Sequence, residues 1–181
     1  MSVTHLSMDE LRAGLDHIAA SPKDSGPLVL IVRRPGRDVR EVVTDGILSL
    51  ADGLVGDGWR DRMDPGDPSP DTQITIINTR LIGLLAPDAS RWPLAGDQLY
   101  VDLDLGLDNL PPGTRLGVGS AILEVTAEPH TGCKKFVSRF GLDAMKFVNS
   151  PEGRRMNLRG IYAKVAQAGT IAQGDVVTKL A

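Results

Sequence analysis

The stretch "TRLGVGSAILEVTAE", residues 114–128, gives the clearest indication of the fold. It contains two short runs rich in β-forming side chains, and Gly117 and Gly119 lie between them. Runs of this length that meet at glycine predict two strands joined by a turn.

Similar short runs on both sides of this pair predict further strands. They are "LVLIVRR" (28–34), "REVVTDGILSL" (40–50), "QITIIN" (73–78), "DQLYVDLDLG" (97–106) and "GIYAKVAQAGTIAQGDVVTKL" (160–180). The last run contains Ala168-Gly169, which predicts a hairpin. Many short strands with glycine-containing turns point to a closed barrel or a compact sandwich that carries a few helices.

Helical patterns occur in two places. Residues 7–20 place leucines at helical spacing behind a Ser-x-x-Glu capping box. We expect residues 1–27 to form a helical extension packed on a β domain at 28–181. Apolar residues between 136 and 148 predict two short helices that are separated at Gly141.

The length, charge and cysteine content exclude several classes of protein. A chain of 181 residues fits one domain, and its net charge of −3 argues against a general nucleic-acid binder. A single cysteine cannot form an internal disulfide. We expect no signal peptide and no membrane span, because neither a basic run before an apolar core nor an apolar run of about 20 residues occurs. These features predict a cytoplasmic protein.

Charge is distributed unevenly along the chain. The segment from His130 to Lys164 holds eight basic residues and opposes them only with Asp143 and Glu152, so that it carries +6. The rest of the chain therefore carries −9. Such a segment attracts small anions, although a solvated lysine- and arginine-rich helix would show the same composition.

This basic segment contains the only cysteine, in "PHTGCKKFVSRFG" (129–141). Free cysteines are most often buried and inert. Cys133, however, follows a Thr-Gly turn that predicts a helix start, and Lys134 and Lys135 come directly after it. Both features stabilise a thiolate. The residues alone leave the buried and the reactive interpretation equally open.

Other candidate ligands are weaker. His5 and His17 lie in or before the first helix, and no histidine spacing typical of zinc occurs. His130 could hydrogen-bond the nearby thiol, but we prefer the interpretation that it ends the preceding strand. Two aspartate-rich stretches, "DRMDPGDPSPD" (61–71) and "DLDLGLDN" (102–109), are interpreted as structural. The first contains three prolines without the ligand order of a calcium loop, and the second alternates like a half-buried strand.

Several blocks of the sequence resemble the MOSC domain, which is named after the C-terminal part of molybdenum cofactor sulfurase. The blocks run in the family's order. They are "GLVGDGW" (53–59), "QITIIN" (73–78), "LAGDQLYVDLDL" (94–105), "LPPGTRLGVGSAILEVTAEPHTGCKKF" (110–136) and "LRGIYAKVAQAGTIAQGDVV" (158–177).

The resemblance implies a mainly β fold, a closed barrel of the type also found in pyruvate kinase, with a few short α-helices. It implies that Cys133 is the family's characteristic cysteine, a catalytic residue or a ligand of molybdenum in a pterin cofactor, or a residue that handles sulfur. The cofactor carries a phosphate, and the resemblance implies that lysines and arginines of the basic segment bind it. We expect the cofactor to contact Thr131, Gly132, Lys134, Lys135, Arg139, Asn157 and Arg159.

Two positions depart from the family pattern. Many members have Gly-Glu-Asn where this chain has Gly96-Asp97-Gln98, and many have a histidine near Trp59. The first hypothesis is therefore a protein that binds molybdenum cofactor (molybdopterin) or carries sulfur. The alternatives are a molybdenum-dependent oxidoreductase acting on N-hydroxylated small molecules, or a barrel without cofactor that binds a small anion.

Expected partners are a small-molecule cofactor or anion and a separate electron-transfer or sulfur-donor protein, because the chain has no reductase domain of its own. We expect a monomer or homodimer that binds neither nucleic acid nor membrane.

Overall fold

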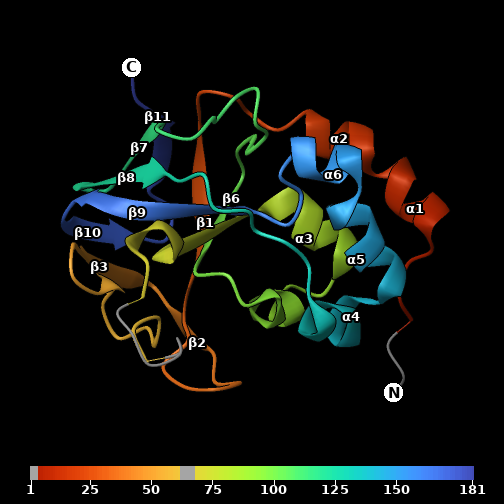
Figure 1. Ribbon diagram of the computed structural model, residues 1–181, viewed down its shortest axis with the longest axis horizontal. Helices are drawn as coiled ribbons and strands as arrows, with labels where there is room; N and C mark the ends of the chain where they lie inside the picture. The colour runs from red at the N-terminus through yellow and green to blue at the C-terminus, as the bar shows by residue number, and fades with distance from the viewer. Residues whose placement is uncertain (1–3, 62–67) are drawn as a thin grey trace.

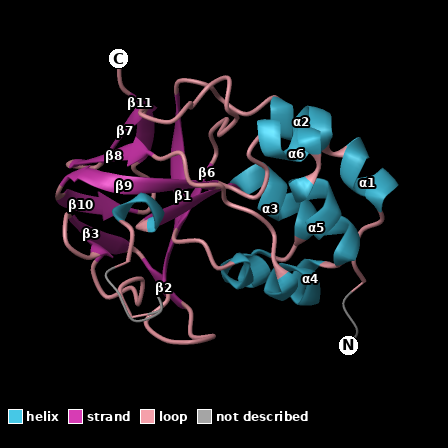
Figure 2. Cartoon of the chain, viewed as in Figure 1, coloured by secondary structure: helices cyan, strands magenta, loops and turns pink. Residues whose placement is uncertain are grey.

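The computed structural model describes residues 4–61 and 68–181. Strands and helices separate into two halves of the molecule (Figures 1 and 2). The strands are β1 (Ser25–Arg33), β2 (Glu41–Val43), β3 (Asp45–Ser49), β4 (Gly53–Leu54), β5 (Ile74–Asn78), β6 (Leu99–Val101), β7 (Arg115–Val118), β8 (Ala121–Val125), β9 (Ile161–Gln167), β10 (Gly169–Ala172) and β11 (Val176–Lys179). The α-helices are α1 (Met8–Ala13), α2 (Leu15–Ala19), α3 (Thr79–Leu85), α4 (Lys134–Phe140), α5 (Leu142–Asn149) and α6 (Pro151–Arg155), and the 3₁₀ turns are η1 (Pro70–Thr72) and η2 (Ala89–Ala95).

Within the described residues, seven strands close into a barrel, as predicted. Their order is β11-β7-β8-β9-β5-β6-β1, and the ring closes because β1 pairs antiparallel with β11 at Ser25 and Thr178. All neighbours in the ring are antiparallel except β5 and β6, which α3 and η2 connect. The glycine-linked strands of the opening stretch form the hairpin β7–β8.

The predicted hairpin at Ala168-Gly169 is wrong. β9 and β10 do not pair with each other there, because β10 pairs with β3 in a separate small sheet of order β10-β3-β4. The glycine is needed for another reason: a Cβ at Gly169 would overlap the backbone of Ser120 and Ala121. The chain therefore bends from the barrel into the small sheet.

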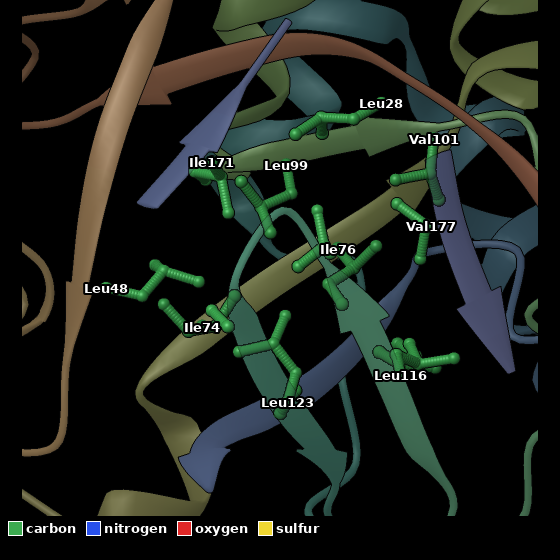
Figure 3. Packing of buried hydrophobic residues seen from close by; sticks show 14 of the residues in the cluster. Leu28, Leu48, Ile74, Ile76, Leu99, Val101, Leu116, Leu123, Ile171 and Val177 are labelled. Atoms are coloured by element: carbon green, nitrogen blue, oxygen red, sulfur yellow. The ribbon is translucent and has the colours of Figure 1, made fainter. Parts of the chain in front are cut away.

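Two hydrophobic cores explain why so many strand residues are buried on both faces. The first fills the barrel, where Leu28, Ile76, Leu99, Leu123 and Val177 point toward one another (Figure 3). The second lies between the outside of the barrel and the helices. Its members include Leu11, Val32, Ile77, Leu81, Tyr100, Phe136 and Phe147.

The second core accounts for a difference from the sequence prediction at residues 97–106. Burial alternates only from Val101 to Leu105, because residues 97–101 are all buried and Tyr100 lies on the face expected to be wet. Strand pairing ends at Val101. Its ring lies under the helical layer, and its hydroxyl donates to the carbonyl oxygen of Trp92 at 2.8 Å. Tertiary packing thus covers a face that the local pattern would leave in water.

The predicted helices are confirmed. Ser7 and Glu10 form the capping box of α1, and Gly14 separates α1 from α2. The basic segment forms α4 and α5, which are separated at Gly141. The N-terminal helices pack against the second core, and β1 begins at Ser25, inside the range predicted for the extension.

The two faces of β8 give a direct test of the barrel core. We expect Leu123→Ala to lower the free energy of unfolding by about 2–5 kcal/mol, because Leu123 is buried in the barrel. The matched change Ile122→Ala removes a half-buried side chain from the other face and should cost about 1 kcal/mol. Urea unfolding measures both. Equal losses for the two variants would contradict the assignment of faces.

Candidate functional site

Cys133 lies directly before α4 in extended backbone, and its side chain is exposed. The loop in front of it is held by Asn149 of α5, which accepts from the Gly132 amide at 2.9 Å and donates to the Gly132 carbonyl oxygen at 3.1 Å. A Cβ at Gly132 would lie 3.1 Å from Val148, so glycine allows this close approach. The thiol is therefore presented at the surface by a fixed loop, and the interpretation of a buried cysteine is excluded.

A buried ion pair lies behind this loop. Arg159 donates to Asp97 Oδ2 at 2.7 Å and to the carbonyl oxygen of Ala95 at 2.9 Å. The guanidinium also lies over the ring of Phe136, 5.0 Å from its centre, which connects the pair to the first turn of α4.

His130 completes this group and does not act on the thiol. Its Nδ1 lies 3.7 Å from Asp97 Oδ1, and its ring packs against Tyr162 with centres 4.5 Å apart. Both His130 and Cys133 are described, and no hydrogen bond joins them. Burial lowers the pKa of His130 well below 6.5, and the charges of Arg159 and Arg34 lower it further. The imidazole is therefore neutral at pH 7.

The group holds unused hydrogen-bonding capacity. Asp97 Oδ1, His130 Nδ1 and Arg159 Nε are buried without a hydrogen-bond partner in the described part of the chain. Burial raises the pKa of Asp97, against the opposing effect of Arg159. Arg34 adds a second buried ion pair with Asp57 at 2.9 Å and donates to the carbonyl oxygen of Gly96 at 2.8 Å.

An enclosed cavity of about 220 Å³ borders this group. Thr131, Asn157, Arg159 and His130 contribute to its wall. Most of the remaining wall is apolar, with Leu107, Leu110, Val125, Val148 and Ile161. The arrangement suits an organic ring with a polar edge.

A second cavity, of about 400 Å³, is cationic. Arg37, Arg40 and Lys135 line it together with Asp38. Arg139 extends the cluster, since it donates to Asp38 at 3.1 Å, and Lys135 lies 3.5 Å from the same carboxylate. Burial lowers the pKa of Arg40, and the neighbouring charges of Arg139 and Arg34 lower it further. Asp38 and Asp61, which also lines the cavity, offset part of this charge, and the remaining excess of basic side chains favours a further anion.

The expected cofactor residues thus fall into two groups. Thr131, Asn157 and Arg159 border the enclosed cavity, and Asn157 also donates to the carbonyl oxygen of Leu105 at 2.8 Å. Lys135 and Arg139 belong to the cationic cluster. Lys134 is exposed next to the thiol.

Sequence reasoning missed several members of these groups, including three that lie close to the ion pair or the cationic cavity. Asp97, Arg34 and Arg40 come from segments far from the basic segment, so that no spacing connects them with Cys133. The one available signal was the position of Asp97 in the block that departs from the family pattern.

The residues at the two positions that depart from the family pattern have different roles. Gln98 is structural, because its buried Oε1 accepts from the amide and hydroxyl of Thr75 on the neighbouring strand β5. Asp97 instead faces the site. Trp59 is buried and donates to the hydroxyl of Thr72 at 3.2 Å.

The described residues contain no group of three or more His, Cys, Asp or Glu side chains that could hold a metal ion. Asp102 pairs with Arg80 at 2.8 Å, and Asp104 accepts from the Gly106 amide. Of the other aspartate-rich stretch, residues 62–67 lie outside the described part of the chain. No described helix has both the length and the hydropathy to cross a membrane.

Comparison with solved structures places the fold. The crystal structure of YiiM from Escherichia coli matches with a TM-score of 0.58 and 18% identity, over 87% of this chain and 70% of that one. YiiM from Geobacillus stearothermophilus gives 0.60 and 16%, over 86% and 75%. The YuaD protein from Bacillus subtilis gives 0.59 and 16%, over 84% and 94%. At these identities the likeness shows the fold alone, and no curated protein matches the sequence.

The sequence itself matches a family model. Residues 70–178, more than half of the chain, match the model of the MOSC domain. The match includes the β7–β8 hairpin, the loop with Cys133 and the segment with Arg159. The chain therefore belongs to the MOSC domain family.

Proposed function

We propose that this protein binds molybdenum cofactor, with the thiolate of Cys133 as a ligand of the metal. The exposed thiol on a fixed loop, beside two cavities of different chemistry, carries the proposal. A thiolate is the soft ligand that suits such a metal. The family to which the chain belongs is named for the same cofactor.

The residues present fit the group. Since no set of three protein ligands occurs among the described residues, other ligands of the metal would come from the cofactor itself. The cationic cavity with Arg37, Arg40 and Lys135 offers donors for a phosphate. The unpartnered Nε of Arg159 and the neutral ring of His130 offer polar contacts near the enclosed cavity.

When bound, the cofactor supplies redox chemistry at molybdenum. The chain's own residues would bind and orient it. Cys133 would provide the thiolate, Lys135 and Arg40 would bind the phosphate, and Asn149 would hold the loop in place. An oxidoreductase would then need electrons from a separate protein, whereas a carrier would pass on the cofactor or sulfur without turnover.

A second candidate function rests on the cationic cavity alone. Arg37, Arg40 and Lys135 can bind a small anion without any contribution from Cys133. This corresponds to the alternative hypothesis of a barrel that binds a small anion and no cofactor.

Replacement of the thiol distinguishes the two functions. We expect Cys133→Ser to abolish bound molybdenum, because a hydroxyl gives no soft, ionised ligand near neutral pH. Since Cys133 is exposed, the substitution should change the protein's free energy of unfolding by less than about 0.5 kcal/mol. Molybdenum and pterin are measured in both proteins, purified side by side from one cofactor-producing host.

Equal molybdenum in the wild type and in Cys133→Ser would show that Cys133 is not a ligand. Absence of molybdenum and pterin from both would favour the second candidate function.

Phosphate binding tests the cationic cavity. We expect Lys135→Ala to weaken binding of inorganic phosphate about fivefold or more, because a charge-assisted contact is lost. Lys146→Ala removes an exposed lysine of α5 outside this cavity and is the matched control. Calorimetric titration at two salt concentrations measures both. Equal affinities would argue against the site.

A substitution of Arg159 is not suitable for this test. Removal of Arg159 would leave the Asp97 carboxylate buried without its cation, which costs about 3–5 kcal/mol.

A further inference from the structure

The enclosed cavity beside His130 adjoins the site proposed for the cofactor and has a chemistry of its own. Its walls are mostly apolar, and Cys133 is not among the residues that line it. The cationic cluster of Lys135 and Arg40 lies at the other cavity. The polar groups here can therefore meet either a part of the cofactor or a separate small ligand.

The orientation of His130 is set by its surroundings. Only 8% of the side chain is exposed, and Nδ1 is the ring nitrogen that is buried against Asp97 Oδ1. A Cβ on Gly160 would lie 3.2 Å from this nitrogen and would overlap the Ile76 carbonyl oxygen, so glycine with its φ of +110° makes room for the ring. Tyr162 packs against the ring.

This orientation favours the tautomer with the proton on Nδ1. The neutral imidazole carries one proton, and a proton on Nδ1 faces the unpartnered carboxylate oxygen of Asp97. Nε2 then has a free lone pair. Because His130 borders the cavity while Nδ1 is turned toward Asp97, Nε2 is the nitrogen available to a ligand there.

We propose that this cavity binds a small, flat, uncharged molecule that donates an N–H or O–H hydrogen bond to Nε2 of His130, with Asp97 as the positioning residue. Apolar walls disfavour a charged ligand. The charge of Arg159 is already matched by Asp97, so that it adds little to the binding of an ion of either sign. The other charged residues of the lining, Glu128 and Arg154, are exposed and of opposite sign. Binding of such a molecule in the cavity does not depend on the proposed function. The further idea that the molecule is a substrate held beside Cys133 rests on the proposed function.

Indole and 1-methylindole test the proposal, because the two probes are similar in shape and only indole has an N–H donor. Long-range ¹H–¹⁵N spectra of the full chain report the ring nitrogens of its three histidines, and His130→Gln assigns the signals of His130. We expect the Nδ1–H tautomer of His130. Indole should shift the Nε2 signal and bind about fivefold more tightly than 1-methylindole.

Variants separate this site from the others. His130→Gln should remove the preference for indole, whereas His17→Gln, at an exposed helix position, should keep it. Leu107→Trp, at a side chain that is 45% exposed in the cavity wall, should weaken both probes. Asp97→Asn is not a suitable variant, because it would leave the Arg159 guanidinium buried without its anion.

Several outcomes would overturn the proposal: an Nε2–H tautomer in the wild type, equal affinities for the two probes, or no saturable binding of indole. Cys133→Ser should bind indole as the wild type does. If indole binds normally but no molybdenum is found in the wild type, the proposed function fails and this site remains. If molybdenum is bound through Cys133 but indole does not bind, this proposal alone fails.

Discussion

The buried ion pair between Asp97 and Arg159 is the constraint on which the site depends. Asp97 precedes β6 and Arg159 precedes β9, so that the pair joins segments that are far apart in the sequence. A buried charge without its partner costs several kcal/mol, whereas a matched pair with further hydrogen bonds is tolerated. The loops at this end of the barrel must therefore come together. Phe136 under the guanidinium connects α4 to the same point.

Two chemically different environments lie on the two sides of this ion pair. On one side, His130 is held neutral against Asp97 and borders an apolar cavity. On the other side, Arg40, Arg139 and Lys135 surround the carboxylate of Asp38 at the cationic cavity. Because Asp97 matches Arg159, the buried positive charge does not extend into the apolar cavity. One end of the barrel can in this way present a mostly apolar pocket, a pocket rich in basic side chains and an exposed thiol on neighbouring loops.

The helical layer gives these loops their rigidity. It packs on the outside of β1, β5 and β6 through a second core and covers faces that an isolated barrel would leave in water. Asn149 at the end of α5 binds both backbone groups of Gly132 and so fixes the loop that presents Cys133. The thiol is thus exposed while its backbone is held by a buried layer.

The sequence alone determined the elements that depend on local pattern. The β7–β8 hairpin, the capping box at Ser7 and the break between α4 and α5 at Gly141 follow from apolar periodicity and glycine, which act within a few residues. The family blocks likewise pointed to the barrel and to Cys133. Only the tertiary structure decided that Ala168-Gly169 is a bend between sheets and that Tyr100 is buried. It alone brought Asp97, Arg34 and Arg40 to the site, because burial and charge pairing act between segments that no local spacing relates.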